Sequence, residues 1–176
     1  MNPKGEAEIH IAPYDASWPD RFEDERCALS QAIDEYVVGA IEHVGSTAVP
    51  GLAAKPVIDI MVGVEGLSAS RAALPTLEKL GYCHFPYRPD AMHWLCKPSP
   101  QFRTHHLHLV PFRSRPWIER IALREYLKTH SEVAADYANL KHRLAEQYIC
   151  DREAYTDAKG PFIRRVLELA LLVEID

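Results

Sequence analysis

Several features that mark well-known protein classes are missing from this sequence. None of its four cysteines forms a C-x-x-C pair, which argues against a zinc ribbon or a thioredoxin-type motif. A net charge of -5 gives no electrostatic reason to expect a nucleic acid partner. No apolar run approaches the length of a membrane span, and the first residues have no signal-peptide core. We therefore expect a cytoplasmic protein with reduced thiols and no membrane partner.

Two common catalytic signatures are also absent. There is no G-x-x-x-x-G-K-[ST], so a P-loop kinase is not indicated, and there is no G-x-S-x-G nucleophile elbow. The 176 residues, 47% hydrophobic and 26% charged, are typical of one globular domain with a real core. We expect a single domain over 1–176, with a flexible tail at 1–8 and a helical C-terminal part at 114–176.

The hydrophobic periodicity changes along the chain and predicts an α+β fold. We expect strands at 37–43, 57–64, 82–87, 91–97 and 102–112. We expect helices at 17–36, 68–80, 114–130 and 131–148 and around 162–169. Pro75 predicts a kink or a later start in the second of these helices.

The turn between the first two predicted strands carries residues suited to an anion. Gly45, Ser46 and Thr47 offer backbone N–H groups and two hydroxyls, and Lys55 adds a positive charge. Asp59 lies inside an apolar strand, where an unpaired carboxylate is costly. A turn that can bind an anion, a nearby lysine and a strand aspartate together indicate a nucleotide site. An ordinary turn with a capping hydroxyl and an aspartate at the strand edge explains the same residues.

The predicted strand at 102–112 carries two histidines with the same orientation. Strand alternation places His106 and His108 on one face, and Arg103 on the other. Arg103 is therefore expected to reach a cleft on the histidine face only near the strand end. Arg124 belongs to a predicted helix face with basic residues at four-residue steps, which usually indicates a solvated surface.

A long motif in this chain resembles the signature of the GrpB family, an uncharacterised group with a nucleotidyltransferase-like fold. The motif reads H-V-G-S-T-A-V-P-G-L-A-A-K-P-V-I-D over 43–59. Further matching segments are 103–108, 124–127, 137–144, Tyr155, Lys159 and Phe162. The resemblance covers roughly 11–169. It implies a mixed β-sheet flanked by helices and a small phosphorylated ligand or nucleotide.

The resemblance also raises a question about metal. Nucleotidyl transfer in this fold normally needs Asp-x-Asp on one strand, but here Met61 stands in the second position, after Asp59. His106 and His108 complete a set with Asp59 that suits zinc, manganese or iron better than magnesium. The alternative is that these histidines hydrogen-bond a phosphate or the Asp59 carboxylate without metal.

The sequence therefore predicts a site in three parts. The predicted catalytic residues, also the predicted ligands for a divalent Mg, Mn or Zn ion, are Asp59, His106 and His108. The predicted phosphate-binding residues are His43, Gly45, Ser46, Thr47, Lys55, Arg103, Arg124, Lys141 and Lys159. Three functions fit: nucleotidyl or phosphoryl transfer, a non-catalytic binding module for a coenzyme A-related ligand, or a metal-dependent hydrolase using His and Asp.

Overall fold

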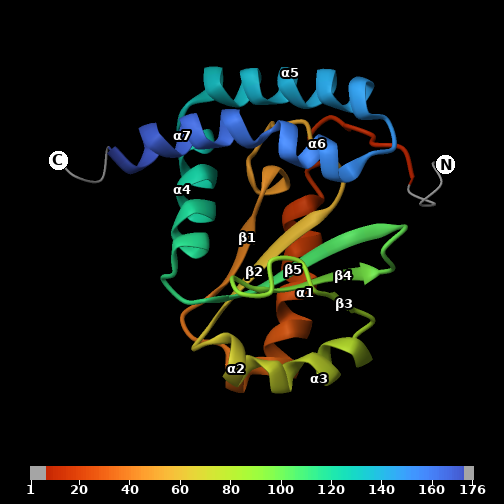
Figure 1. Ribbon diagram of the computed structural model, residues 1–176, viewed down its shortest axis with the longest axis vertical. Coiled ribbons are helices and arrows are strands. Elements are labelled where there is room, and N and C mark those ends of the chain that lie inside the picture. Colours follow the sequence, from red (N-terminus) through yellow and green to blue (C-terminus); the bar gives the residue numbers. More distant parts are fainter. Residues whose placement is uncertain (1–6, 173–176) are drawn as a thin grey trace.

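The computed structural model describes residues 7–172 and is built on a five-stranded mixed sheet (Figure 1). The strands are β1 (Ile41–Val44), β2 (Ile58–Val64), β3 (Cys83–Phe85), β4 (His93–Pro98) and β5 (Arg103–Pro111). Their order in the sheet is β1-β2-β5-β4-β3. β2 and β5 are parallel, whereas the other neighbours are antiparallel. The predicted α+β class with a mixed sheet is confirmed.

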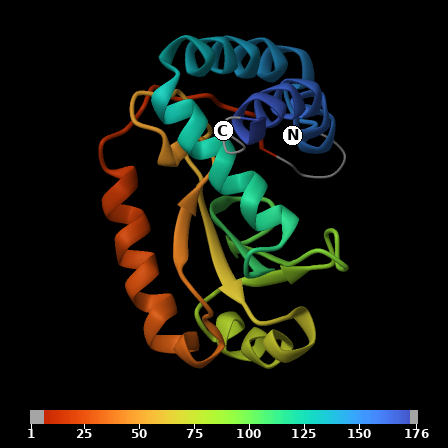
Figure 2. The same cartoon turned by 90° about the vertical axis from the view of Figure 1, so that its left-hand side faces the viewer.

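Helices cover both faces of the sheet and one of its ends (Figure 2). They are α1 (Trp18–Ile33), α2 (Leu67–Ser70), α3 (Leu74–Lys79), α4 (Arg115–Thr129), α5 (Ser131–Tyr148), α6 (Arg152–Ala158) and α7 (Gly160–Leu172). Short 3-10 turns lie at η1 (Asp34–Tyr36), η2 (Ser46–Ala48) and η3 (Arg71–Ala73). The last three α-helices lie together across the end of the sheet that carries η2 (Figure 1). None of the described helices has the length and apolar character needed to cross a membrane.

The main hydrophobic core lies between the sheet and α1. Leu29 and Ile33 of α1 pack against Ile60 of β2 and against Leu107 and Leu109 of β5, and all five side chains are fully buried. Alternate residues of the same two strands point the other way, toward α4. Both faces of the sheet therefore contain apolar packing, and the α4 face also carries Asp59, His106 and His108.

Strand register brings the motif aspartate and the histidines together. Asp59 of β2 lies opposite His106 of β5, and Met61 lies opposite His108. The predicted shared face of the two histidines is confirmed by their joint approach to Asp59.

Arg103 is the first residue of β5, so it lies at the strand end from which it was expected to reach the histidine face. The β4–β5 ladder shifts register between Lys97 and Pro98, so that Arg103 pairs with Pro98 while His105 pairs with Lys97. This irregularity interrupts the alternation assumed from the sequence. The Arg103 guanidinium lies over the Trp94 ring on the histidine face, 5.0 Å from its centroid.

Several predicted boundaries also differ from the structure. The first strand begins at Ile41 rather than at 37, because Gly39 adopts a φ of 94° and packs against Phe112. The predicted helix at 68–80 is broken into α2, η3 and α3, and Pro75 lies in the first turn of α3. Helix α6 was not predicted. Most of the expected tail at 1–8 and the last four residues of the helical C-terminal part lie outside the described residues.

Candidate functional site

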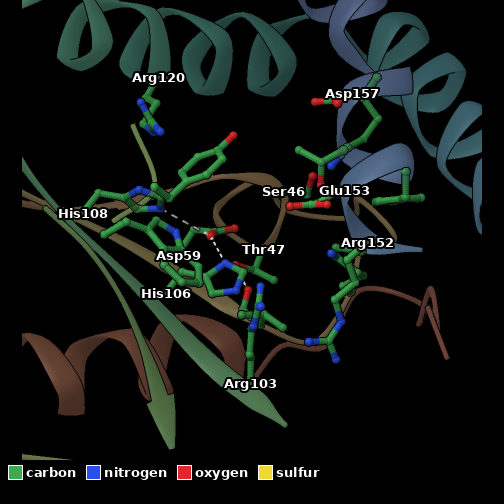
Figure 3. Close-up of a pocket in the computed structure, with 18 of the residues that line it drawn as sticks. Ser46, Thr47, Asp59, Arg103, His106, His108, Arg120, Arg152, Glu153 and Asp157 are labelled. Carbon is green, nitrogen blue, oxygen red and sulfur yellow. Dashed lines mark hydrogen bonds and ion pairs between the residues drawn. The ribbon is translucent and has the colours of Figure 1, made fainter. Parts of the chain in front are cut away.

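A cleft lies between the open face of the sheet, α4 and the C-terminal helices (Figure 3). It consists of two cavities of about 670 and 710 Å³. Residues that line both cavities include Asp59, His108, Arg120, Asp157 and Lys159. The two cavities therefore meet at the aspartate of the sequence motif.

The centre of the cleft is a carboxylate held by two histidines. Asp59 Oδ1 lies 2.8 Å from His106 Nδ1 and 3.8 Å from His108 Nε2. Burial alone would raise the pKa of Asp59, but its interactions with both histidines hold that pKa well below its usual range. Burial and the nearby charge of Arg120 lower the pKa of His108 to about 4. Asp59 is thus ionised and His108 neutral near pH 7.

The turn after β1 is fitted closely to this carboxylate. Gly45 has a φ of 72°, and a Cβ added there would lie 2.5 Å from Asp59 Oδ2. Only glycine satisfies both conditions without strain. Thr47 donates its hydroxyl to the Val57 carbonyl, at 3.3 Å. Ser46 lines both cavities, so it is the hydroxyl of this turn that a ligand in either cavity meets.

His43 supports the turn from the far side of the sheet. Its Nε2 is 3.0 Å from Thr47 Oγ1, and its ring stacks on Phe22 of α1 at a centroid distance of 4.7 Å. Burial lowers the pKa of His43 to about 4, so the ring is neutral. His43 does not line either cavity. His43, predicted as a phosphate-binding residue, therefore lies where it can orient the loop rather than line the cavities.

Three lysines from distant parts of the sequence converge on the first cavity. Lys55 and Lys159 place their ammonium groups over the Tyr155 ring, 4.9 and 4.5 Å from its centroid. Lys141, only 2% exposed, lies 4.7 Å from the centroid of Tyr137 and donates to the Ala53 carbonyl. None of these lysines forms an ion pair within residues 7–172.

Their environment disfavours the charged state of all three lysines. Burial, reinforced by the neighbouring Lys159 charge, lowers the pKa of Lys55 to about 8 and that of Lys141 to about 7. Burial lowers the pKa of Lys159 to about 8, although the Asp59 carboxylate opposes the shift. Three partly or fully buried ammonium groups therefore share one cavity without forming ion pairs in the part of the chain that the structure describes.

Arginines add to this positive charge. The first cavity is lined by six cationic side chains, Lys55, Arg103, Arg120, Lys141, Arg152 and Lys159, and by three carboxylates, Asp59, Glu153 and Asp157. Arg120 reaches into the cleft from α4 toward His108 (Figure 3). Arg152 donates to the carbonyls of Pro100 and Gln101, both at 2.9 Å.

One wall of the first cavity is aromatic. Phe85, Tyr87 and Trp94 line it, and the rings of Phe85 and Tyr87 lie 6.0 and 6.2 Å from that of Trp94. The Arg103 guanidinium covers part of the Trp94 ring. Trp94 is buried, whereas Tyr87 is exposed and offers a ring beside cationic side chains on which a planar group can stack.

Arg124 is placed differently from the other predicted phosphate ligands. Its Nη1 donates to Glu42 Oε2 and to the His43 carbonyl, both at 2.7 Å, and its Nε donates to Glu125 Oε1 at 2.6 Å. Arg124 lines the second cavity only. These bonds fasten α4 to β1, so the structure gives Arg124 a structural task besides any contact with a ligand.

The central residues do not fit the metal site that the fold family implies. Met61 occupies the position of the second carboxylate, and within residues 7–172 no three His, Cys, Asp or Glu side chains are grouped to hold one ion. His106 uses Nδ1 to bind Asp59, and its Nε2 is shielded from solvent. Coordination through this ring would require it to turn away from the carboxylate.

Thus the structure gathers most of the predicted site residues in one cleft. Sequence reasoning missed Arg120, whose helix was taken as a solvated face, and Arg152, Glu153 and Asp157, which belong to the unpredicted α6. A cap signal for α6 was present, because Asp151 accepts a hydrogen bond from the Ala154 backbone N–H. His93 of β4 does not line either cavity and bonds the Leu67 carbonyl at 2.8 Å.

Comparison with known proteins agrees with the motif resemblance. The family model for GrpB protein matches residues 8–169. The chain belongs to the GrpB family. A UPF0157 protein of Pseudomonas aeruginosa is 40% identical over 93% of this chain and 68% of its own length. A dephospho-CoA kinase of Mycolicibacterium paratuberculosis is 27% identical over 90% of this chain but only 45% of its own.

Solved structures support the same fold. The conserved protein GrpB from Enterococcus faecalis has a TM-score of 0.85 and 32% identity, covering 95% of this chain and 100% of that one. The structure of the GLD-2/RNP-8 complex has a TM-score of 0.56 and 15% identity, covering 84% of this chain and 58% of that one. The structure of a cytoplasmic RNA terminal U-transferase has a TM-score of 0.50 and 14% identity, covering 80% of this chain and 43% of that one. The GrpB chain therefore has a nucleotidyltransferase-like fold.

Proposed function

We propose that the cleft binds a phosphorylated small molecule of the nucleotide class. The observation that carries the proposal is the convergence of Lys55, Lys141 and Lys159 on one cavity without an ion-paired carboxylate among the described residues. Bringing like charges together in a partly buried site costs free energy, which an anion offsets. Phosphate oxygens suit both ammonium groups and guanidinium forks.

The aromatic wall favours a nucleotide over a simple phosphate ester. A base stacked on Tyr87 would lie in the same cavity as the lysines. The sequence similarity to a dephospho-CoA kinase supports a coenzyme A-related nucleotide as one ligand of this class. Because that relative is more than twice as long as the matched segment, its activity is not transferred to this chain.

A second candidate function is transfer of a phosphoryl or nucleotidyl group to a small acceptor. It is favoured by Asp59, which lines both cavities and is bound to His106. Asp59 would accept a hydrogen bond from an acceptor hydroxyl and orient it. The new P–O bond would form to that oxygen while the bond to the leaving group breaks, and the hydroxyl proton would pass to Asp59. With ATP as donor, the leaving group is ADP in phosphoryl transfer and pyrophosphate in nucleotidyl transfer. A His/Asp metal-dependent hydrolase has less support, because these side chains bind one another.

Isothermal titration calorimetry tests the binding proposal. ATP and inorganic pyrophosphate are expected to bind the wild type, and adenosine is expected to bind much more weakly. Lys55→Met combined with Lys159→Met removes two cationic groups from the cavity, whereas Lys128→Met removes one that pairs with Glu125 outside it. Only the double variant should lose affinity. Equal binding of ATP by both variants would overturn the proposal.

Incubation with ATP and a mixture of small hydroxyl compounds, followed by phosphorus NMR, tests transfer. A phosphorylated or nucleotidylated product that disappears with Asp59→Asn supports it. Binding of ATP without any product after prolonged incubation would leave the protein as a binding module.

A further inference from the structure

We propose that the cleft binds its phosphorylated ligand without a divalent metal ion, using Arg120 and Lys159 beside Asp59 as the source of positive charge. This inference rests on the proposed function. It separates this chain from a nucleotidyltransferase that receives its nucleotide as a magnesium complex. Three observations support the inference. A second carboxylate is missing from β2, Asp59 is already bound by histidines, and cationic side chains lie near Asp59.

The position that would complete a metal site is part of the hydrophobic core. Met61 is 0% exposed and packs with Val44, Trp94 and Cys96 in the cluster beneath the cleft. Magnesium requires several oxygen ligands and binds through one or two carboxylates together with phosphate. Here β2 supplies Asp59 alone, and the opposing strand supplies imidazole nitrogens instead of oxygens.

The one carboxylate of β2 is already engaged. Asp59 Oδ1 is 2.8 Å from His106 Nδ1 and 3.8 Å from His108 Nε2, while Oδ2 faces Gly45 closely enough to exclude a Cβ. A metal ion would have to displace these contacts. The Asp59 side chain is 30% exposed, so it remains open to the cleft as a carboxylate.

Cations already surround the carboxylate. Arg120 donates to the Pro116 carbonyl at 3.3 Å and contacts Met92 Sδ at 3.8 Å, but pairs with no carboxylate among the described residues. Asp59 is near enough to oppose the burial-driven lowering of the pKa of both Arg120 and Lys159. A divalent ion placed beside Asp59 would be repelled by both groups, whereas a phosphate would be attracted.

This inference is tested by titrating the wild-type protein with ATP in a calorimeter, once in EDTA and once in excess magnesium. Magnesium neutralises part of the phosphate charge, so ATP in EDTA is expected to bind roughly tenfold more tightly. Binding only in magnesium would overturn the inference and keep the proposed function. The absence of binding under both conditions would overturn both.

Two variants sharpen the experiment. Arg120→Gln should lower ATP affinity more in EDTA than in magnesium, because magnesium replaces the missing charge. A purely structural role for Arg120 would lower both affinities by the same factor and would contradict its direct role. Met61→Asp restores the second carboxylate and should reverse the preference toward magnesium. If this variant does not fold, the wild-type titration still decides.

Discussion

Two buried lysine environments on opposite faces of the sheet show how this molecule separates structure from function. On the α1 face, Lys97 Nζ lies 2.9 Å from both carboxylate oxygens of Glu25, which also accepts a 2.9 Å hydrogen bond from the Tyr82 hydroxyl. In the cleft, Lys55 and Lys159 lie over an aromatic ring with no such carboxylate within the described range. The fold supplies a carboxylate to the first lysine, and the proposed ligand would supply an anion to the other two.

The difference teaches how to distinguish a structural cation from a ligand-binding one. A paired ion contributes to stability and is harmful to remove, because its partner is left buried and uncompensated. An unpaired, partly buried ion costs stability in the free protein and contributes only when a ligand arrives. Variants on the two faces should therefore change different measured quantities.

The largest effect on stability is expected from Glu25→Gln. The change leaves Lys97 without its counter-ion, and the free energy of unfolding should fall by roughly 2 kcal/mol, allowing for the partial exposure of Lys97. Urea denaturation measures the loss. ATP affinity at a temperature where the variant is folded should not change. If ATP affinity also fell, the two faces of the sheet would be coupled, and the distinction between a structural lysine and a binding lysine would not hold.

The largest effect on binding is expected from Lys159→Met. The ammonium group lies over Tyr155 beside Asp59, and its loss should weaken ATP binding about tenfold to thirtyfold, the range of one or two charge-assisted hydrogen bonds. The melting temperature of the free protein should stay constant or rise. Lys128→Met is the matched control on α4. If the variant loses stability but keeps its affinity for ATP, Lys159 has a structural role and does not contact the ligand.

The binding of ATP should also depend on pH in one direction. The free protein has pKa values of about 8 for Lys55 and Lys159 and about 7 for Lys141, so these groups lose protons between pH 6.5 and 9. A bound phosphate stabilises their charged forms, so affinity should fall as pH rises through this window.

Stability of the free protein should move the opposite way. The unfolded lysines keep ordinary pKa values near 10.5, so above pH 8 the unfolded state binds more protons than the folded one, and stability rises with pH. Titrations and melts at pH 6.5, 7.5 and 9 measure both trends. An ATP affinity that is constant over this range would exclude the lysines from the phosphate site.

The smallest effect is expected from Asp59→Asn. Removal of the carboxylate lessens repulsion of the phosphates, so ATP affinity in EDTA should rise about threefold. Any transfer activity should be lost, because the acceptor would no longer be oriented. A clear fall in affinity would instead indicate that Asp59 holds a metal–nucleotide complex. Calorimetry in EDTA and in magnesium separates these outcomes.

Much of the fold could be predicted because local patterns determine it. The alternation in β5 placed His106 and His108 on one face, and the long motif around Gly45 identified the turn and Asp59. The register shift between Lys97 and Pro98 could not be predicted, since it depends on the pairing of two strands rather than on one.

The charged composition of the cleft was harder to predict. Arg120 and Arg152 look like ordinary surface residues in sequence, and only the packing of α4 beside the sheet and of α6 against α5 and α7 brings them to the same cavity. Lys141 and Lys159 were included through family resemblance, whereas their burial and missing counter-ions are tertiary properties. Local sequence does not specify which charges will remain unpaired after folding.

Thermal melting of the wild-type protein with millimolar ATP, compared with millimolar adenosine, tests the central claim that the cleft is an anion site. A ligand present at about 100 times its dissociation constant adds roughly 2.7 kcal/mol to stability. For a chain of this length, that amounts to a rise of about 5–10 °C in melting temperature. The cleft chemistry predicts this rise with ATP and a negligible one with adenosine. Equal shifts with both compounds, or none with ATP and pyrophosphate, would contradict it.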